Sequence, residues 1–244
     1  MRMKKINKLL KKHRYICFLD FEGSQFSHEM IAYGAVLAYL DKNGNIKRCK
    51  RPIKYLVKCK NKVGRYVEKL TGITSEELDK VGIPFSKAMK ELKKYCGLAF
   101  NRMSFMTFGN HDMRILSQSV SYNLDAPTEI TKVIQKNYID FQNIISEFIK
   151  DNNNNPYSLT NYLKVFGIKF DGIEHDPRDD AMNLMLLYKA FMNDKDILLK
   201  EYLKTLGKLN HIPDPAKEAL RKLSNGESVT GEEFKALAKE YIND

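Results

Sequence analysis

The 244-residue sequence has few of the features that mark secreted, membrane-spanning or zinc-binding proteins. Its four cysteines lack the CxxC pairing of zinc sites, so they are predicted to be reduced, partly buried thiols. No segment approaches the roughly 18 apolar residues of a membrane-spanning helix. Residues 1–14 are basic and lack the apolar segment of a secretory signal. We therefore expect a soluble, cytoplasmic protein.

Positive charge is in excess. The chain contains 41 lysines and arginines and 30 aspartates and glutamates, which gives a formal net charge of +11. With 43% hydrophobic and 29% charged residues, it is too apolar for a disordered tail and too polar for a bundle of membrane helices. The charge favours polyanionic partners, such as nucleic acid or an anionic membrane surface.

The hydrophobic pattern predicts an α/β fold. Asn43-Gly44 lies between two of the apolar runs, so the first three strands are expected to form an antiparallel meander. The later strands alternate with helical patterns, which predicts a mixed five-stranded sheet flanked by helices. The five expected strands are residues 15–19, 30–40, 46–59, 103–108 and 138–141.

Three parts are expected along the chain. A basic lead occupies residues 1–14, a principal domain residues 15–195, and a helical C-terminal extension residues 196–244. In the extension, helical patterns are interrupted by proline and glycine, and no strand pattern occurs.

Two carboxylates follow the first apolar run. Asp20 and Glu22 are two residues apart at the end of a buried strand, so both side chains point to the same face. Adjacent anions repel and lose hydration unless a cation compensates them, and Mg²⁺ prefers oxygen ligands. The alternative is that the strand ends at Leu19 and the two acids are solvated.

Asp112 follows the strand at residues 103–108 and lies in the first turn of the next predicted helix. Acidic residues are favoured at helix N-termini, so Asp112 is also explained as a helix cap. Its position is nonetheless where open α/β sheets bind ligands.

A second acidic segment opens a later helix. Asp176 is expected as the N-cap, Pro177 as the first helical residue and Asp179 as a further cap at the third position. Asp180 then falls in the first turn, and His175 lies in the loop just before it. Capping does not explain the histidine, a residue type that exchanges protons near neutral pH and serves as a general base.

Together these motifs resemble the DEDDh 3′-to-5′ exonucleases. Asp20-x-Glu22 on the first strand, Asp112 after a later strand, and His175-x4-Asp180 at a helix start occur in the order of that superfamily. The resemblance covers roughly residues 15–193. Each motif alone is weak, whereas the combined order is specific.

The segment 70–74, Leu-Thr-Gly-Ile-Thr, followed by Pro84-Phe85, is similar to the connector between the first two motifs of the family. The surroundings of Asp20 and Asp112 look most like the exoribonuclease branch that includes the enhancer-of-RNAi and KapD-like enzymes. Two positions depart from that pattern: Ser24 stands where the family often has threonine, and His111 where the branch commonly has an aromatic residue.

The resemblance implies a ribonuclease H-like fold in which four carboxylates, Asp20, Glu22, Asp112 and Asp180, hold two Mg²⁺ or Mn²⁺ ions. It also implies that His175 is the general base, so the catalytic set comprises these five residues. The expected reaction is metal-dependent hydrolysis of terminal phosphodiester bonds at single-stranded 3′ ends, RNA being favoured, with release of nucleoside 5′-monophosphates. No membrane partner is expected, and protein partners are not specified.

Four further residues are candidate substrate contacts: Gly23, Ser24, Leu70 and Ile73. A simple turn at Gly23 and Ser24, and a helix-ending glycine at residue 72, explain the same positions equally well. Asp140 follows another strand and is expected to be structural.

Two groups of basic residues suit a polyanionic substrate, although lysines on a solvated edge strand also prevent aggregation. They are Lys4, Lys5, Lys8, Lys11, Lys12 and Arg14 at the N-terminus, and Lys47, Arg48, Lys50, Arg51, Lys54, Lys58, Lys60 and Lys62 near the third strand.

Two alternative functions remain: a DNA 3′-to-5′ exonuclease of the proofreading type, and a non-catalytic nucleic-acid-binding protein that keeps the fold. The complete set of five site residues argues against the second alternative.

Overall fold

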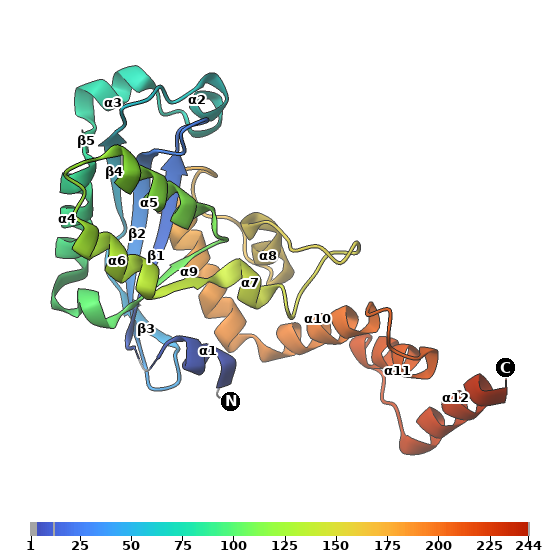
Figure 1. The fold of residues 1–244 in the computed structure, drawn as a ribbon. Helices are drawn as coiled ribbons and strands as arrows, with labels where there is room; N and C mark the ends of the chain where they lie inside the picture. The colour runs from blue at the N-terminus through green and yellow to red at the C-terminus, as the bar shows by residue number, and fades with distance from the viewer. Residues whose placement is uncertain (1–3, 12, 244) are drawn as a thin grey trace.

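The protein is described by a computed structural model over residues 4–11 and 13–243, in which a mixed sheet lies between two layers of helices (Figure 1). The strand order is β5-β4-β2-β1-β6-β7, and β3 pairs with β2. β1 runs antiparallel to β2 and parallel to β6. The strands are β1 (Tyr15–Gly23), β2 (Met30–Leu40), β3 (Ile46–Cys49), β4 (Ile53–Lys58), β5 (Ile83–Pro84), β6 (Ser104–Thr107) and β7 (Tyr138–Asp140).

Helices cover both faces of the sheet. One face packs against α4, α5 and α6, and the other against α7, α8 and α9. The helices are α1 (Lys4–Leu9), α2 (Arg65–Thr71), α3 (Ser75–Val81), α4 (Phe85–Cys96), a 3₁₀ helix (Gly97–Arg102), α5 (His111–Tyr122), α6 (Thr128–Lys136), α7 (Phe141–Ile145), α8 (Leu159–Val165), α9 (Pro177–Asn193), α10 (Lys195–Gly207), α11 (Asp214–Ser224) and α12 (Gly231–Asn243).

β1 is buried on both faces, as its continuous apolar pattern predicts. Ile16 and Phe18 belong to the core that includes α9, whereas Cys17 and Leu19 belong to the core that includes α4 and α5. Side chains alternate along a strand, so Asp20 and Glu22 continue the row that faces α9. The alternation of side chains along β1 therefore places Asp20 and Glu22 next to α9.

The fold class is confirmed, but the sheet has seven strands among the described residues, not five. The expected strand at residues 46–59 is divided into β3 and β4, which both pair with β2. Pro52 lies at the break, and proline has no N–H to continue a ladder. The other addition is β5, a two-residue strand too short to produce a sequence pattern.

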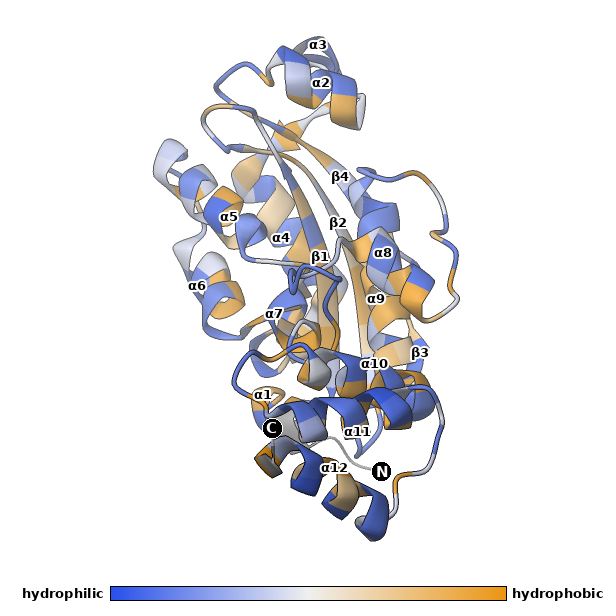
Figure 2. Ribbon diagram, turned by 90° about the vertical axis from the view of Figure 1, so that its right-hand side faces the viewer, coloured by the Kyte–Doolittle hydropathy of each residue, from blue (hydrophilic) through white to orange (hydrophobic). Residues whose placement is uncertain are grey.

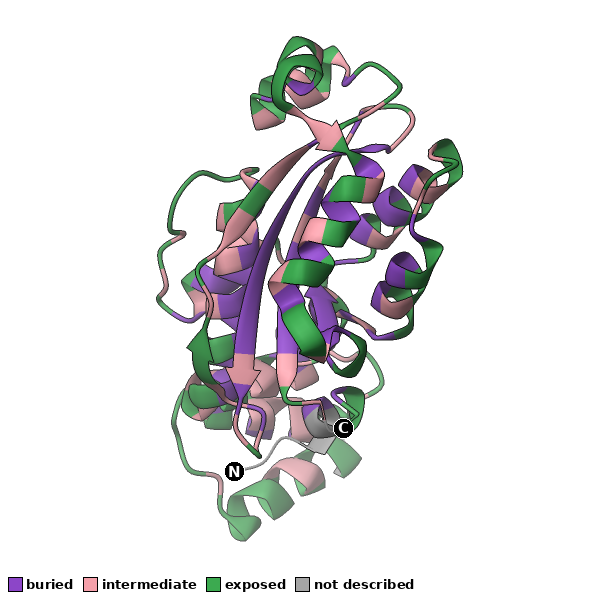
Figure 3. Ribbon diagram, turned by 90° about the vertical axis from the view of Figure 1, so that its left-hand side faces the viewer, coloured by how far each residue is buried: buried purple, intermediate pink, exposed green. Residues whose placement is uncertain are grey.

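The two ends of the chain differ in how they contact this core. Within the N-terminal segment, Ile6 and Leu10 are buried in the core that includes α9; Lys12 of the predicted basic lead lies outside the described residues. Helices α10 to α12 extend away from the sheet (Figure 1), and α11 and α12 are largely hydrophilic (Figure 2). Figure 3 shows the same contrast as burial, since the central strands are buried and α12 is mostly exposed. Across the described part of the chain, no helix combines the length and apolarity needed to cross a bilayer.

Candidate active site

The end of β1 supplies the first two carboxylates. Asp20 pairs with Gly34 of β2 in the antiparallel register, and a β-bulge between Glu22 and Gly23 ends the regular pairing. Asp20 and Glu22 lie on the face of the sheet that α9 covers, as their spacing predicts. The alternative of two acids solvated beyond Leu19 is not what the structure shows, because β1 continues through Gly23.

Asp112 enters from the opposite layer. It is the second residue of α5, only 5% exposed, and its Oδ1 accepts a hydrogen bond of 2.7 Å from the backbone N–H of Phe21. The carboxylate therefore spans from α5 to β1 between the two predicted ligands. Asp112 is not the N-cap of α5, which is Asn110; its carboxylate accepts its own backbone N–H in the first turn of the helix as well as the N–H of Phe21.

The start of α9 brings in the last two residues. Asp176 is the N-cap, its carboxylate accepts the N–H of Arg178, and Pro177 is the first helical residue, as predicted. This end of the helix lies directly on β2: a Cβ added to Gly34 would be 1.8 Å from the carbonyl oxygen of Pro177. The absence of a side chain at Gly34 thus allows the helix to approach the strand residue that pairs with Asp20.

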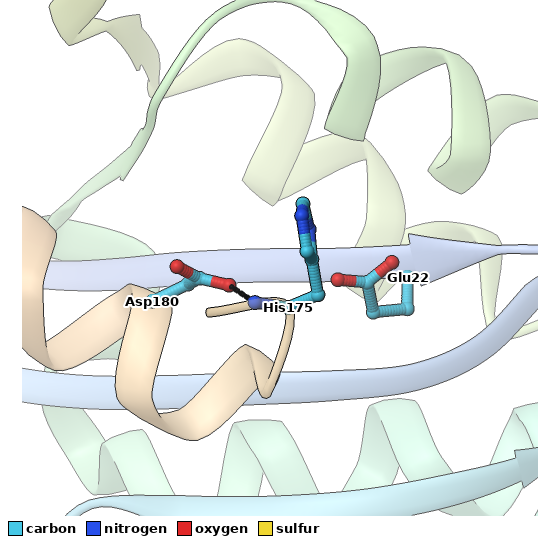
Figure 4. A group of neighbouring side chains, drawn as sticks. All are labelled: Glu22, His175 and Asp180. Atoms are coloured by element: carbon cyan, nitrogen blue, oxygen red, sulfur yellow. Dashed lines mark hydrogen bonds between the residues drawn. The ribbon is translucent and has the colours of Figure 1, made fainter. Parts of the chain in front are cut away.

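Asp180 and His175 meet Glu22 at this point. Among the described residues, these three have potential ligand atoms that all lie within 4.8 Å of one another. The backbone N–H of His175 donates to Oδ2 of Asp180 at 2.9 Å. Figure 4 shows the imidazole of His175 standing between the carboxylates of Asp180 and Glu22. Histidine 175 has a φ of 67°, a left-handed conformation that few side chains adopt, so the turn is held by its surroundings.

The prediction for Asp179 was wrong in detail. The side chain does not cap the first turn of α9; Oδ2 accepts the N–H of Ile173, and Oδ1 accepts the Nε–H of Arg178. The chain before α9 folds back over the start of the helix at Gly172, which has a φ of 97°. The N–H of Ile173 thereby reaches Asp179, the third residue of α9. Asp179 therefore fastens the loop that carries His175.

Burial and mutual repulsion dominate the electrostatics. Burial raises the pKa of Asp20 well above its usual range, and the charges of Asp112 and Glu22 raise it further. Burial and the charge of Asp180 raise the pKa of Glu22 to about 8, although Lys54 opposes this shift. Burial also raises the pKa values of Asp112 and Asp180 to about 7, against the hydrogen bonds that each carboxylate accepts. Four acids in one place require a cationic partner to be fully ionised.

An open cleft of about 370 Å³ gives access to the acids. It is lined by residues from β1, the turn after it, α2 and α5, together with His175. Of the predicted substrate contacts, Gly23, Ser24 and Leu70 border the cleft. Leu70 is 40% exposed on α2, and this helix ends at Gly72 in the left-handed conformation that the alternative explanation required.

Ser24 and Ile73 do not present free groups to the cleft. Ser24 is 1% exposed; its hydroxyl accepts the N–H of Glu29 and is 2.6 Å from the Ser27 hydroxyl, so it holds the turn after β1. Ile73 is 3% exposed and packs in a small apolar cluster with Val63 and Leu78. The structure does not bring Ile73 to the cleft, because the chain turns inward after Gly72.

Several cleft residues were not predicted. Tyr66 is 66% exposed and lies four residues before Leu70 on α2. Residues four apart lie on the same face of a helix, so the sequence contained a signal that could have predicted Tyr66. His28 and His111 pack edge to face with ring centroids 5.4 Å apart, and burial lowers the pKa of each. The two histidines are 83 positions apart in the sequence, so no local sequence pattern predicts their contact.

Asp140 is structural, as expected. Its Oδ1 accepts the N–H groups of Gly109 and Asn143, so it caps α7 and supports the loop that leads to Asp112.

The donor set suits hard divalent cations. Carboxylate oxygens from Asp20, Glu22, Asp112 and Asp180, with an imidazole at hand, are the ligand types that Mg²⁺ and Mn²⁺ accept. Burial and mutual repulsion raise the pKa values of Asp20 and Glu22, so a cation bound among these acids would stabilise their ionised forms. The residues present therefore fit a site for divalent metal ions.

Comparisons with known proteins identify the family and the fold of this chain. A family model described as Exonuclease (RNase_T) matches residues 18–188. No curated protein sequence matches the chain. The solved nuclease domain of 3′hExo, a DEDDh family member bound to rAMP, is 22% identical with a TM-score of 0.59, over 75% of this chain and 93% of that one.

Two longer nucleases are similar over a smaller share of their length. A 3′-exonuclease solved in its recognition of a histone mRNA stem-loop gives a TM-score of 0.60 at 22% identity, covering 75% of this chain and 64% of that one. E. coli Exonuclease I with a dT13 oligonucleotide gives 0.57 at 17% identity, covering 82% and 46%. The chain thus spans less than two thirds of either protein. Since the family match extends over most of its length, this chain belongs to the exonuclease family, and its fold is that of the DEDDh exonucleases it resembles.

Proposed function

We propose that this protein is a metal-dependent 3′-to-5′ exonuclease that hydrolyses terminal phosphodiester bonds of single-stranded nucleic acid, with RNA favoured, and releases nucleoside 5′-monophosphates. The observation that carries the proposal is that Glu22, His175 and Asp180 bring their potential ligand atoms within 4.8 Å of one another, beside an open cleft that Asp20, Glu22, Asp112 and His175 line. These residues come from β1, α5 and α9, and no packing requirement explains why three elements bring like charges together.

The four carboxylates are proposed to hold two divalent ions, Mg²⁺ or Mn²⁺. Such ions offset the negative charge of the acids and of the phosphodiester, and stabilise the charge that develops on the attacking and leaving oxygens. Asp112 is held by the Phe21 N–H, and Asp180 by the His175 N–H, so both carboxylates are oriented before substrate binds.

His175 is proposed as the general base. Its side chain is exposed at the cleft and stands beside Glu22, where it can accept a proton from a water molecule aligned with the terminal phosphorus. His111 also lines the cleft, but its ring packs edge to face against that of His28. The proton therefore passes to His175 in this proposal.

The substrate end of the cleft is suited to a single strand. Tyr66 and Leu70 of α2 offer apolar and aromatic surface on one side, and the His28–His111 pair offers rings on another. Bases of any sequence stack on such surfaces. The exposed Lys47 and Arg48 of β3 and Lys58 of β4 would neutralise the phosphates that follow the terminal nucleotide.

RNA is favoured because the motifs around Asp20 and Asp112 resemble the enhancer-of-RNAi and KapD-like branch, and because a structural neighbour is described with rAMP. DNA is the second candidate, since another neighbour is described with a dT13 oligonucleotide. Initial rates on RNA and DNA oligonucleotides of one sequence, each with Mg²⁺ or Mn²⁺, separate the two. Faster RNA cleavage is expected; equal or faster DNA cleavage would contradict the RNA preference.

The role of His175 has its own test. His175→Ala is expected to lower turnover by about 10²–10⁴-fold, the usual contribution of a general base, while Mn²⁺ binding measured by calorimetry stays close to wild type. Loss of Mn²⁺ binding in this variant would instead make His175 a metal ligand.

A further inference from the structure

Lys54 occupies a defined position beside the acidic cluster. On β4 it pairs with Gly34 of β2, which pairs on its other side with Asp20 of β1. Lys54 and Asp20 therefore lie in one row across the sheet, separated by a residue without a side chain. The start of α9 occupies the space above Gly34, so these two residues flank the helix terminus.

An ion pair links Lys54 to that terminus. Its Nζ lies 2.9 Å from Oδ2 of Asp176, and the two side chains are 31% and 18% exposed. The other oxygen of Asp176 accepts the N–H of Arg178 and caps α9. Asp176 thus connects β4 to the helix through one carboxylate. Because the pair is partly shielded from solvent, its geometry is better defined than that of a surface ion pair.

His175 is the residue immediately before Asp176. Its backbone is in the left-handed region, which is unfavourable for a residue other than glycine and persists only where the surroundings hold it. The turn is fastened to α9 by the His175 N–H on Asp180 and by the Ile173 N–H on Asp179. Both of these bonds lie within the loop and its own helix, whereas the Lys54–Asp176 pair ties the turn to the sheet that carries Asp20 and Glu22.

We propose that Lys54 is a positioning residue, which grips Asp176 and thereby keeps the His175 turn fixed over the carboxylates of β1. The inference rests on the proposed role of His175 as general base. Within the basic group near the third strand, it gives Lys54 a task that the other lysines of this group do not share. A displacement of about 1 Å at a reacting group is enough to reduce a rate by about 100-fold, so the tie matters for turnover.

Two other roles for Lys54 make different predictions. In the first, Lys54 affects activity only through its charge, which lowers the pKa of Glu22 in the acidic cluster. In the second, Lys54 contacts a substrate phosphate and raises the affinity for nucleic acid. Neither of these roles passes through His175, and this difference is the basis of the test.

The experiment compares Lys54→Met, Lys54→Arg and Lys204→Met, each in the wild-type and His175→Ala backgrounds. Lys204 is the matched control, because in α10 it forms a similar half-exposed pair with Glu201, at 2.7 Å. The measurements are kcat and KM on a 5′-labelled single-stranded oligonucleotide with Mg²⁺, and amide hydrogen exchange of residues 173–176 without metal.

Lys54→Met is expected to lower kcat by about 10- to 100-fold with KM within about twofold, and to speed exchange of the turn. Lys54→Arg should restore most of the rate, since it keeps a cation within reach of Asp176. Lys204→Met should match wild type. In the His175→Ala background, Lys54→Met should have no further effect on kcat, because the residue it positions is gone.

An equal loss of rate in both backgrounds, a change confined to KM, or unchanged exchange of residues 173–176 would each overturn the positioning role. If His175→Ala alone keeps the wild-type rate, the general base of the proposed function is wrong, and the exchange measurement then decides independently whether Lys54 fixes the turn.

Discussion

The predicted domain at residues 15–195 and the predicted helical extension at residues 196–244 differ in where they place charge. Residues 196–244 contain eight lysines and arginines and nine aspartates and glutamates, so the positive excess lies entirely in the first 195 residues. In the extension the charges pair along the helix surface, as in Lys217 with Asp214 and Arg221 with Glu218. In the domain, acidic residues lie together at one cleft, and exposed lysines and arginines lie together on β3 and β4.

Burial separates the two regions in the same way. Asp112, at 5% exposure, shows that the domain buries a carboxylate at considerable cost. In α12 the large apolar residues Phe234, Tyr241 and Ile242 are 41%, 53% and 79% exposed. Both regions are rich in charged residues, but the region with the acidic cluster is distinguished by charged side chains that are buried at an energetic cost.

The largest expected effect comes from removing one carboxylate of the acidic cluster. Asp20→Ala should reduce cleavage by at least about 10³-fold, because divalent ions at this site supply several kcal/mol of transition-state stabilisation. Asp196→Asn, an exposed carboxylate of the extension, is the control and should retain full activity. Comparable losses in both variants, measured as kcat/KM, would erase the distinction between the regions.

A glycine in each region gives the next contrast. Gly34→Ala places a Cβ 1.8 Å from the Pro177 carbonyl, so α9 must shift; we expect kcat to fall by about 10- to 100-fold and Tm to decrease. Gly207→Ala in α10 meets its nearest atom at 3.9 Å and should leave activity unchanged and Tm equal or slightly higher. Wild-type kinetics in Gly34→Ala would show that the approach of α9 to β2 does not position the site.

Basic residues of the two regions should differ in how they affect nucleic-acid binding. Replacing Lys47, Arg51 and Lys58 by glutamine should flatten the slope of log affinity against log salt by about 2, as expected for three lost phosphate contacts on a single strand. Replacing Lys217, Arg221 and Lys222 in α11 should leave the slope unchanged. Equal slopes for the two triple variants would mean that the β3–β4 lysines serve only to protect an edge strand.

The smallest effect is on stability without metal. The folded pKa values of Glu22, Asp112 and Asp180, about 8, 7 and 7, lie above their unfolded values. Protonation therefore favours the folded state, and this contribution is complete below about pH 4 and lost as pH rises through 7 to 8. In a chelator, Tm should decline over this window.

Asp20→Asn removes one of the repelling charges. It should raise Tm at pH 8 by roughly 2–4 °C, the shift that corresponds to about 1 kcal/mol in a protein of this size. Asp196→Asn should follow the wild-type curve. A Tm that is independent of pH between 5 and 8 in chelator would contradict the repulsion among the site carboxylates.

The sequence carried enough information to predict the fold class and the acidic cluster, because both depend on local patterns. Strand parity places Asp20 and Glu22 on one face, and Asp176-Pro177 marks the start of α9. What failed depends on long-range geometry. The break at Pro52, the inward turn of Ile73 and the bonds of Asp179 to its upstream loop arise from packing between distant segments.

The same limit explains the features that sequence did not predict. Gly34 and Lys54 are 20 residues apart in the sequence, yet they pair across two strands and both lie against the start of α9. The sequence around a glycine in a buried strand does not reveal that a helix lies against it. Such contacts become visible only when the register of three strands is known.

The central claim is exonucleolytic cleavage from the 3′ end at the metal-loaded cluster of the domain. The most direct measurement digests one single-stranded RNA, labelled at the 5′ end or at the 3′ end, with Mg²⁺ or Mn²⁺. The 5′ label should give a ladder with one-nucleotide steps, the 3′ label a labelled mononucleotide from the earliest times, and chelator or Asp20→Ala should abolish both. A ladder from the 3′ label, or cleavage that survives chelator or Asp20→Ala, would contradict the account.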